Sequence, residues 1–179
     1  MNEKEVKECF SNALKDEQKG KKHKGLLTTK PDEEKAKEYL EKAKTNLELC
    51  SFYKEKGFDY KIPEEWYYTL YYCGLAILSK FGVETRSQRC TAAFLKVIKE
   101  KGLIEYSDEF IDRITVHSGK KEKSNVDERE SARYSSSIKS EEVESQFEKM
   151  NETCKKAIEE SKEIVYSNKK YQVPEEITK

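Results

Sequence analysis

Residues 63–81 read PEEWYYTLYYCGLAILSKF, and after the first three residues they are apolar or aromatic almost all round. Pro63 with Glu64 and Glu65 marks a helix start, because proline lacks the N–H that a first helical turn leaves unpaired and because carboxylates are favoured at the positive end of a helix. A helix with apolar side chains on every side is buried centrally or packs on two sides at once. The segment therefore predicts a central helix over residues 63–80, with Gly82 after its end.

Helical periodicity continues on both sides of this segment. Apolar residues recur there at spacings of three and four, whereas period-2 alternation and hairpin dipeptides are nearly absent. Pro31 is expected to open the second helix, Gly57 to stop it and Ser140 to cap the last one. The predicted helices span residues 2–18, 31–56, 63–80, 86–100, 107–117 and 140–167, with a turn or two of helix at 127–135. The predicted fold is all-α, an up-and-down helical bundle with an extra N-terminal helix.

The composition fits a folded chain with long, solvated helices. Its 179 residues favour one domain, divided here into an N-terminal helix and basic loop (1–30), the bundle (31–167) and a frayed tail (168–179). Lysine and arginine number 35, as do aspartate and glutamate, so the net charge is zero. A neutral chain has no overall attraction for nucleic acid or anionic membrane, so any such binding needs a local patch.

Location, redox state and cofactors are inferred from what the chain lacks. The first ten residues have no apolar core and do not resemble a signal peptide, and no apolar run approaches the roughly 18 residues of a membrane span. We therefore expect a cytoplasmic protein outside the membrane. The five cysteines lie far apart without a CxxC pair. The expectation is buried, reduced thiols, no metal site and no cofactor.

The most suggestive polar segment is DERESARYSSS, residues 127–137. Arg129 and Arg133 are four residues apart, so on a helix they share a face, where two guanidiniums repel unless a carboxylate or a phosphate bridges them. One interpretation is a structural bridge to an acidic side chain. The other is an anion-binding site for nucleotide or RNA, formed with Tyr134 and joined by Arg86 and Arg89 from the helix over 86–100.

Two further groups of residues have alternative interpretations. The aromatic cluster of the central helix would stack nucleic-acid bases or form core and dimer interface; it comprises Trp66, Tyr67, Tyr68, Tyr71 and Tyr72. His23 belongs to GKKHKG, which is either a flexible basic loop or, with its neighbouring lysines, a phosphate-contacting patch. The lysines of that patch are Lys19, Lys21, Lys22 and Lys24.

Four pieces in order resemble a HEPN domain, a small helical bundle found in many prokaryotic proteins of nucleotide and RNA metabolism. They are the long helix KAKEYLEKAKTNLELCSFYKEKGFDY, the aromatic helix EEWYYTLYYCGLAILSKFGVET, the amphipathic helix TAAFLKVIKEKGLI, and R-x-x-A-x-Y followed by a long last helix. The resemblance covers about residues 31–167. In the R-x-x-A-x-Y piece the matching residues are Arg129, Ala132 and Tyr134.

The resemblance implies a homodimer that acts as a ribonuclease or as the partner of a nucleotidyltransferase. Nuclease members carry a histidine four to six residues beyond the arginine. Here ESARYSSS follows Arg129, no histidine lies downstream, and Arg133 replaces the family's acidic residue. We therefore expect a HEPN-like nucleotide- or RNA-binding protein that is not an enzyme. The alternatives are the bundle partner of a nucleotidyltransferase in a toxin–antitoxin pair, and an active metal-independent ribonuclease that uses Arg113 and His117.

Overall fold

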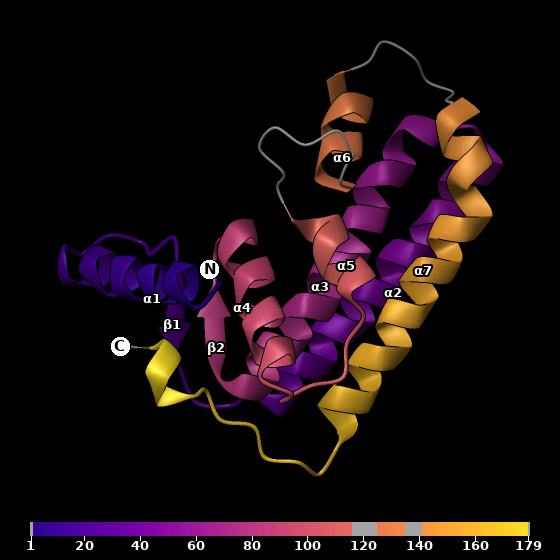
Figure 1. The fold of residues 1–179 in the computed structure, drawn as a ribbon. Coiled ribbons are helices and arrows are strands. Elements are labelled where there is room, and N and C mark those ends of the chain that lie inside the picture. Colours follow the sequence, from indigo (N-terminus) through magenta and orange to yellow (C-terminus); the bar gives the residue numbers. More distant parts are fainter. Residues whose placement is uncertain (1, 116–124, 135–140, 179) are drawn as a thin grey trace.

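The computed structural model describes residues 2–115, 125–134 and 141–178. Helices make up most of these residues, and they confirm the predicted all-α helical bundle (Figure 1). In chain order the elements are α1 (Asn2–Gln18), β1 (Leu26–Thr28), α2 (Glu33–Lys56), α3 (Ile62–Phe81), β2 (Val83–Thr85), α4 (Gln88–Glu100), α5 (Asp108–Ile114), α6 (Asn125–Tyr134) and α7 (Glu141–Tyr166). Two short 3₁₀ turns, η1 (Asp59–Lys61) and η2 (Glu175–Ile177), complete the set.

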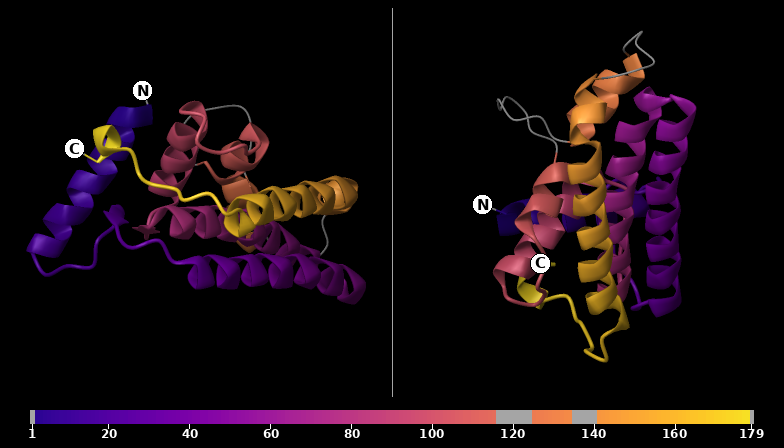
Figure 2. Two further views of the ribbon diagram at one scale, coloured as in Figure 1. Left: turned by 90° about the horizontal axis from the view of Figure 1, so that it is seen from below. Right: turned by 90° about the vertical axis from the view of Figure 1, so that its right-hand side faces the viewer.

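Helix α3 is the central element, as its all-round apolarity predicts. The long helices α2 and α7 lie beside it, and the shorter α4, α5 and α6 also pack against it (Figures 1 and 2). Trp66 is 1% exposed, and its indole Nε1 donates a hydrogen bond of 2.9 Å to Oδ1 of Asn151 on α7. The buried indole therefore keeps its one polar group paired, which fixes α3 against α7.

The ends of α2 and α3 are set by capping residues. Asp32, not Pro31, is the N-cap of α2, because its carboxylate accepts the N–H of Lys35 at 2.9 Å, so the helix begins two residues later than predicted. Gly57 and Gly82 end the two helices in the left-handed conformation, with φ of 74° and 71°. At Gly82 a Cβ atom would also lie 2.6 Å from the carbonyl oxygen of Thr29, so the close passage of the chain requires glycine.

The segment after α1 does not follow the prediction of a structure without strands. Residues 26–28 pair antiparallel with residues 83–85, in a register that places Leu26 opposite Thr85 and Thr28 opposite Val83. Strands of three residues are too short to show alternation in a sequence, and this explains why the pattern missed them. The pairing attaches the N-terminal residues to the end of α3.

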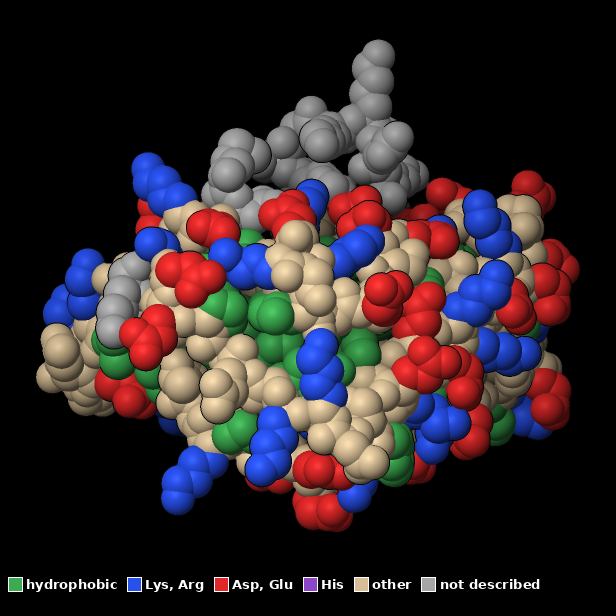
Figure 3. Space-filling view, turned by 60° about the horizontal axis from the view of Figure 1, so that its bottom comes forward, with side chains coloured by type: hydrophobic (Ala, Val, Ile, Leu, Met, Phe, Trp, Pro, Cys, Tyr) green, Lys and Arg blue, Asp and Glu red, His purple; other side chains and the backbone are tan. Residues whose placement is uncertain are grey.

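The C-terminal tail also differs from the prediction, because it is packed rather than frayed. Tyr171 is 9% exposed and its ring centroid lies 4.7 Å from that of Phe81, while Ile177 is fully buried. Figure 2 shows the tail crossing from the end of α7 toward α1, which η2 contacts. A groove of about 800 Å³ lies between the tail and residues 28–33. Figure 3 shows one face of the molecule, on which hydrophobic side chains lie near the centre between charged side chains of both signs.

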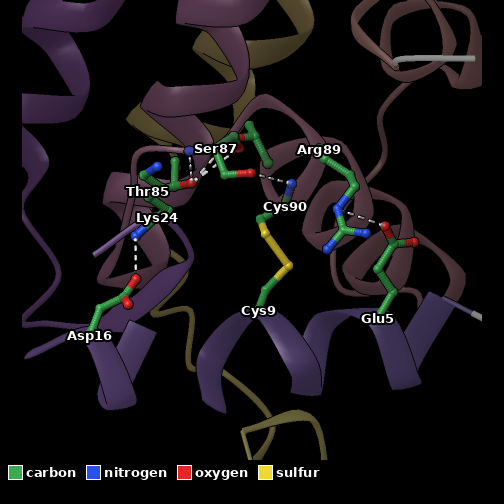
Figure 4. Close-up of a disulfide and its surroundings, with 9 residues drawn as sticks. Glu5, Cys9, Asp16, Lys24, Thr85, Ser87, Arg89 and Cys90 are labelled. Carbon is green, nitrogen blue, oxygen red and sulfur yellow. Dashed lines mark hydrogen bonds and ion pairs between the residues drawn. A yellow bond between two sulfur atoms is a disulfide. The ribbon is translucent and has the colours of Figure 1, made fainter. Parts of the chain in front are cut away.

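A disulfide joins Cys9 of α1 to Cys90 of α4 (Figure 4). The prediction of reduced thiols is therefore wrong for these two cysteines, which are 81 residues apart and meet only in the folded chain. It is confirmed for Cys50, Cys73 and Cys154, which are free and buried. Disulfides are uncommon in reducing compartments such as the cytoplasm. The Cys9–Cys90 bond therefore does not support the predicted cytoplasmic location, which stays a prediction. None of the described helices combines the length and apolarity that crossing a bilayer would need.

Candidate functional site

Helix α6 brings Arg129 onto the aromatic face of α3. Val126 and Arg129, three residues apart and so on one side of α6, are 4% and 9% exposed. The guanidinium carbon of Arg129 lies 4.3 Å from the ring centroid of Tyr67 and 5.9 Å from that of Tyr68. The arginine therefore makes a cation–π contact in a largely desolvated position, where such contacts are strongest.

Two hydrogen-bond donors at this contact are unused. The Nε of Arg129 and the hydroxyl of Tyr67 are both buried, and neither has a hydrogen-bond partner. Burial raises the pKa of Tyr67 well above its usual value, so the phenol keeps its proton and remains a donor. Buried donors without acceptors are rare in folded proteins and costly when they occur. We call Arg129 and Tyr67 together the α3–α6 site.

Arg133 is already paired. It forms a hydrogen-bonded ion pair with Glu64, at the start of α3, and its side chain is 49% exposed. Glu64 therefore supplies the acidic partner that the structural interpretation expects, but for Arg133 alone. Tyr134 is 82% exposed and points away from the core. Of the residues predicted from the segment 127–137, only Arg129 is left with unused donors at a buried position.

Arg86 and Arg89 do not join this group, contrary to the prediction. Arg86 lies 3.7 Å from the carboxylate of Glu84 on β2, and Arg89 lies 3.5 Å from that of Glu5 on α1. Both arginines face the N-terminal helix and the basic segment after it. The reason is the pairing of β1 with β2, which carries the start of α4 toward α1 and which the sequence does not reveal.

The tyrosines of α3 form a packed row rather than an open stacking surface. Tyr67 and Tyr71 stack with centroids 5.7 Å apart, and Tyr68 and Tyr72 do so at 5.8 Å. Trp66 and Tyr67 are buried, and the other three are half-buried against the core. This agrees with the core interpretation of the cluster.

A buried carboxylate that the sequence does not reveal, Glu65, lies next to Trp66 at the start of α3. Glu65 is 9% exposed and accepts a hydrogen bond from the side-chain amide of Asn46 on α2. Burial raises its pKa, and the Asn46 hydrogen bond offsets part of that rise. Nothing in the sequence separates Glu65 from Glu64, because both occupy the first turn of the same helix.

Of the two histidines, the structure describes only His23. His23 is not in a flexible loop: it is 3% exposed, its Nε2 lies 3.4 Å from Oε1 of Glu84, and its Nδ1 is buried without a partner. His117 lies outside the described residues. Arg113, its predicted partner in a nuclease, bonds to Glu109 through Nε at 3.0 Å and Nη2 at 2.8 Å.

No family model, curated protein or solved structure matches this chain. By its fold the protein is an all-α helical bundle, and its described residues include one small two-stranded sheet. Within that described part, no group of three or more His, Cys, Asp or Glu side chains is placed to hold a metal ion.

Proposed function

We propose that the protein is a HEPN-like bundle that binds nucleotide or RNA without cleaving it, and that Arg129 contacts a phosphate group of the ligand. The observation that carries the proposal is the α3–α6 site. Its guanidinium is held on an aromatic ring, is not ion-paired to any described residue, and lies beside a tyrosine hydroxyl that also lacks an acceptor.

A phosphate group suits these donors chemically. A guanidinium presents five N–H groups in a planar fork that matches phosphate oxygens, and stacking on Tyr67 restricts its motion before any ligand arrives. The Tyr67 hydroxyl keeps its proton and can donate a further hydrogen bond to a phosphate oxygen. An acceptor reaching both groups would relieve two unsatisfied buried donors at once.

The absence of cleavage is proposed from the residue pattern. Strand cleavage needs a group that moves a proton at the ribose hydroxyl, most often histidine. No histidine follows Arg129 in the chain, and His23 is buried beside Glu84. The resemblance that supports this proposal also carries the expectation of a homodimer, which light scattering of the purified chain would test.

The site is tested by RNA and nucleotide affinity in matched variants. Arg129→Ala removes the fork, Arg129→Lys keeps the charge without it, and Tyr67→Phe removes only the hydroxyl. A charged hydrogen bond contributes about 1.5–3 kcal/mol, so we expect Arg129→Ala to weaken binding by roughly 10- to 100-fold and Tyr67→Phe by less. Arg133→Ala serves as the control, because Glu64 already occupies that arginine.

Fluorescence anisotropy with a labelled RNA oligonucleotide, and calorimetry with ATP, would measure these affinities. Unchanged affinity for both ligands in Arg129→Ala would remove the proposed site. RNA cleavage by the purified chain would contradict the non-catalytic part of the proposal.

A further inference from the structure

We propose that a second pocket, beside the Cys9–Cys90 disulfide, binds a phosphate group. The pocket lies between the second half of α1, residues 24–25 and the start of α4, and has a volume of about 350 Å³. Four cationic side chains line it: Lys15 of α1, Lys19 just after that helix, Lys24, and Arg89 of α4. We call it the N-terminal pocket.

The charge balance of the N-terminal pocket favours an anion. Asp16 is the only acidic residue among those that line it, and its Oδ2 accepts the backbone N–H of Lys24 at 3.2 Å. Arg89 is partly offset by Glu5 outside the lining, at 3.5 Å. The chain as a whole has zero net charge. Four cations and one carboxylate around this pocket therefore create a local region of positive electrostatic potential.

The three lysines of the pocket differ from several lysines elsewhere in the protein in having no ion-pair partner among the described residues. Lys37, Lys44 and Lys162 each pair with a glutamate three residues earlier, at 2.9, 2.6 and 3.2 Å. Lys15, Lys19 and Lys24 are exposed, and none of them forms an ion pair with a described residue. Their ammonium groups are therefore available to a ligand without first leaving a carboxylate.

The walls of the pocket are held together before any ligand binds. The disulfide fixes α1 to α4, and both of its cysteines belong to the lining (Figure 4). Gly25 packs so closely on α1 that a Cβ atom there would lie 2.0 Å from the carbonyl oxygen of Cys9. Because the backbone that carries these cations is already fixed, binding orders fewer chain segments than it would on a mobile loop.

The ligand class is a phosphate-bearing anion, and it has two sources: a free nucleotide or the backbone of RNA. The cations would contact phosphate oxygens in either case, because a lysine ammonium binds phosphate as a point charge and such contacts do not distinguish one base from another. The proposal does not rest on the α3–α6 site, since the two sites share no residue.

The experiment uses the oxidised full chain with inorganic phosphate, ATP and a labelled 12-nucleotide RNA as probes. The variant is Lys15→Ala/Lys24→Ala, and the control is Lys155→Ala/Lys156→Ala, which removes two exposed lysines from α7. We expect the pocket variant to lose at least about tenfold in affinity for one or more probes and the control to lose less than about twofold. Loss for phosphate and ATP identifies the nucleotide source, and loss for RNA alone identifies the backbone.

Equal affinities in the pocket variant and the unmodified chain would overturn the proposal, as would an equal loss in the control or the failure of all three probes to bind. Arg129→Ala measured in parallel separates the two sites. Loss confined to the lysine variant supports the N-terminal pocket against the α3–α6 site, and loss confined to Arg129→Ala does the reverse.

Discussion

The α3–α6 region and the N-terminal pocket both contain cationic side chains, but these side chains differ in how they are surrounded. Arg129 is buried on an aromatic ring and Arg133 is paired with a carboxylate, whereas Lys15, Lys19 and Lys24 stay exposed around a hollow. A guanidinium is more weakly hydrated than an ammonium, so it loses less hydration when it is buried on a ring. Arg129 is therefore part of the packing between α3 and α6, whereas the three lysines line a pocket whose walls the disulfide holds together.

The largest expected effect comes from removing that disulfide. Cys9→Ser/Cys90→Ser opens a loop of 81 residues, for which the chain-entropy treatment gives about 4.5 kcal/mol of lost stability. Urea unfolding would measure the loss. Hydrogen exchange should show faster exchange in α1 and β1, which the disulfide holds, and little change in α3 and α6.

The unmodified chain in reductant is the control for that variant, and it should reproduce the loss. A double variant as stable as the oxidised chain would mean that the disulfide does not hold the N-terminal region in place.

A smaller effect is expected at Arg129. Arg129→Ala removes a desolvated cation–π contact and the packing of the side-chain stem on Tyr67, and should cost about 1–2 kcal/mol. Arg129→Lys keeps the charge but not the planar group, and should restore less than half of the loss. Chemical denaturation would measure both values, and full stability in Arg129→Lys would show that charge alone is enough.

The smallest effect concerns the adjacent carboxylates of α3. Burial raises the folded-state pKa of Glu65, so the folded protein holds that proton more tightly than the unfolded chain. Stability contributed by the protonated form is therefore lost as pH rises through the folded pKa. Glu65→Gln keeps an oxygen acceptor for Asn46, and should be more stable than the unmodified chain at pH 7 by less than about 1 kcal/mol.

Thermal unfolding at several pH values would test this, and the advantage should vanish below about pH 4, where glutamate is protonated in both states. Glu64→Gln is the matched control with the opposite sign, because it breaks an exposed ion pair and should cost about 0.5 kcal/mol. Identical behaviour of the two variants would contradict the difference in burial.

The sequence was informative where one local pattern determines the structure. All-round apolarity identified α3 as central, and glycine and proline signals placed most helix ends within about two residues. It was uninformative where distant segments meet. Cys9 and Cys90 are separated by 81 residues, the β1–β2 strands are too short for a pattern, and the partners of Arg129 and Arg133 lie on another helix.

The site residues show the same difference between local and distant contacts. The spacing of Arg129 and Arg133 correctly predicts one helix face, because that is a property of the helix itself. The grouping of Arg86 and Arg89 with them was wrong, since it needed the position of α4 relative to α1. Burial of His23 and Glu65 depends likewise on what packs over them, which single-sequence patterns do not report.

The Cys9–Cys90 bond also makes the first half of the molecule a covalent ring. Helices α2 and α3 and the turn between them all lie within the segment from residue 9 to residue 90. A single proteolytic nick in residues 57–61 would therefore leave both fragments attached, and the cut chain would keep its mass until a reductant separates the pieces. Backbone cleavage between α2 and α3 is thus invisible on a non-reducing gel.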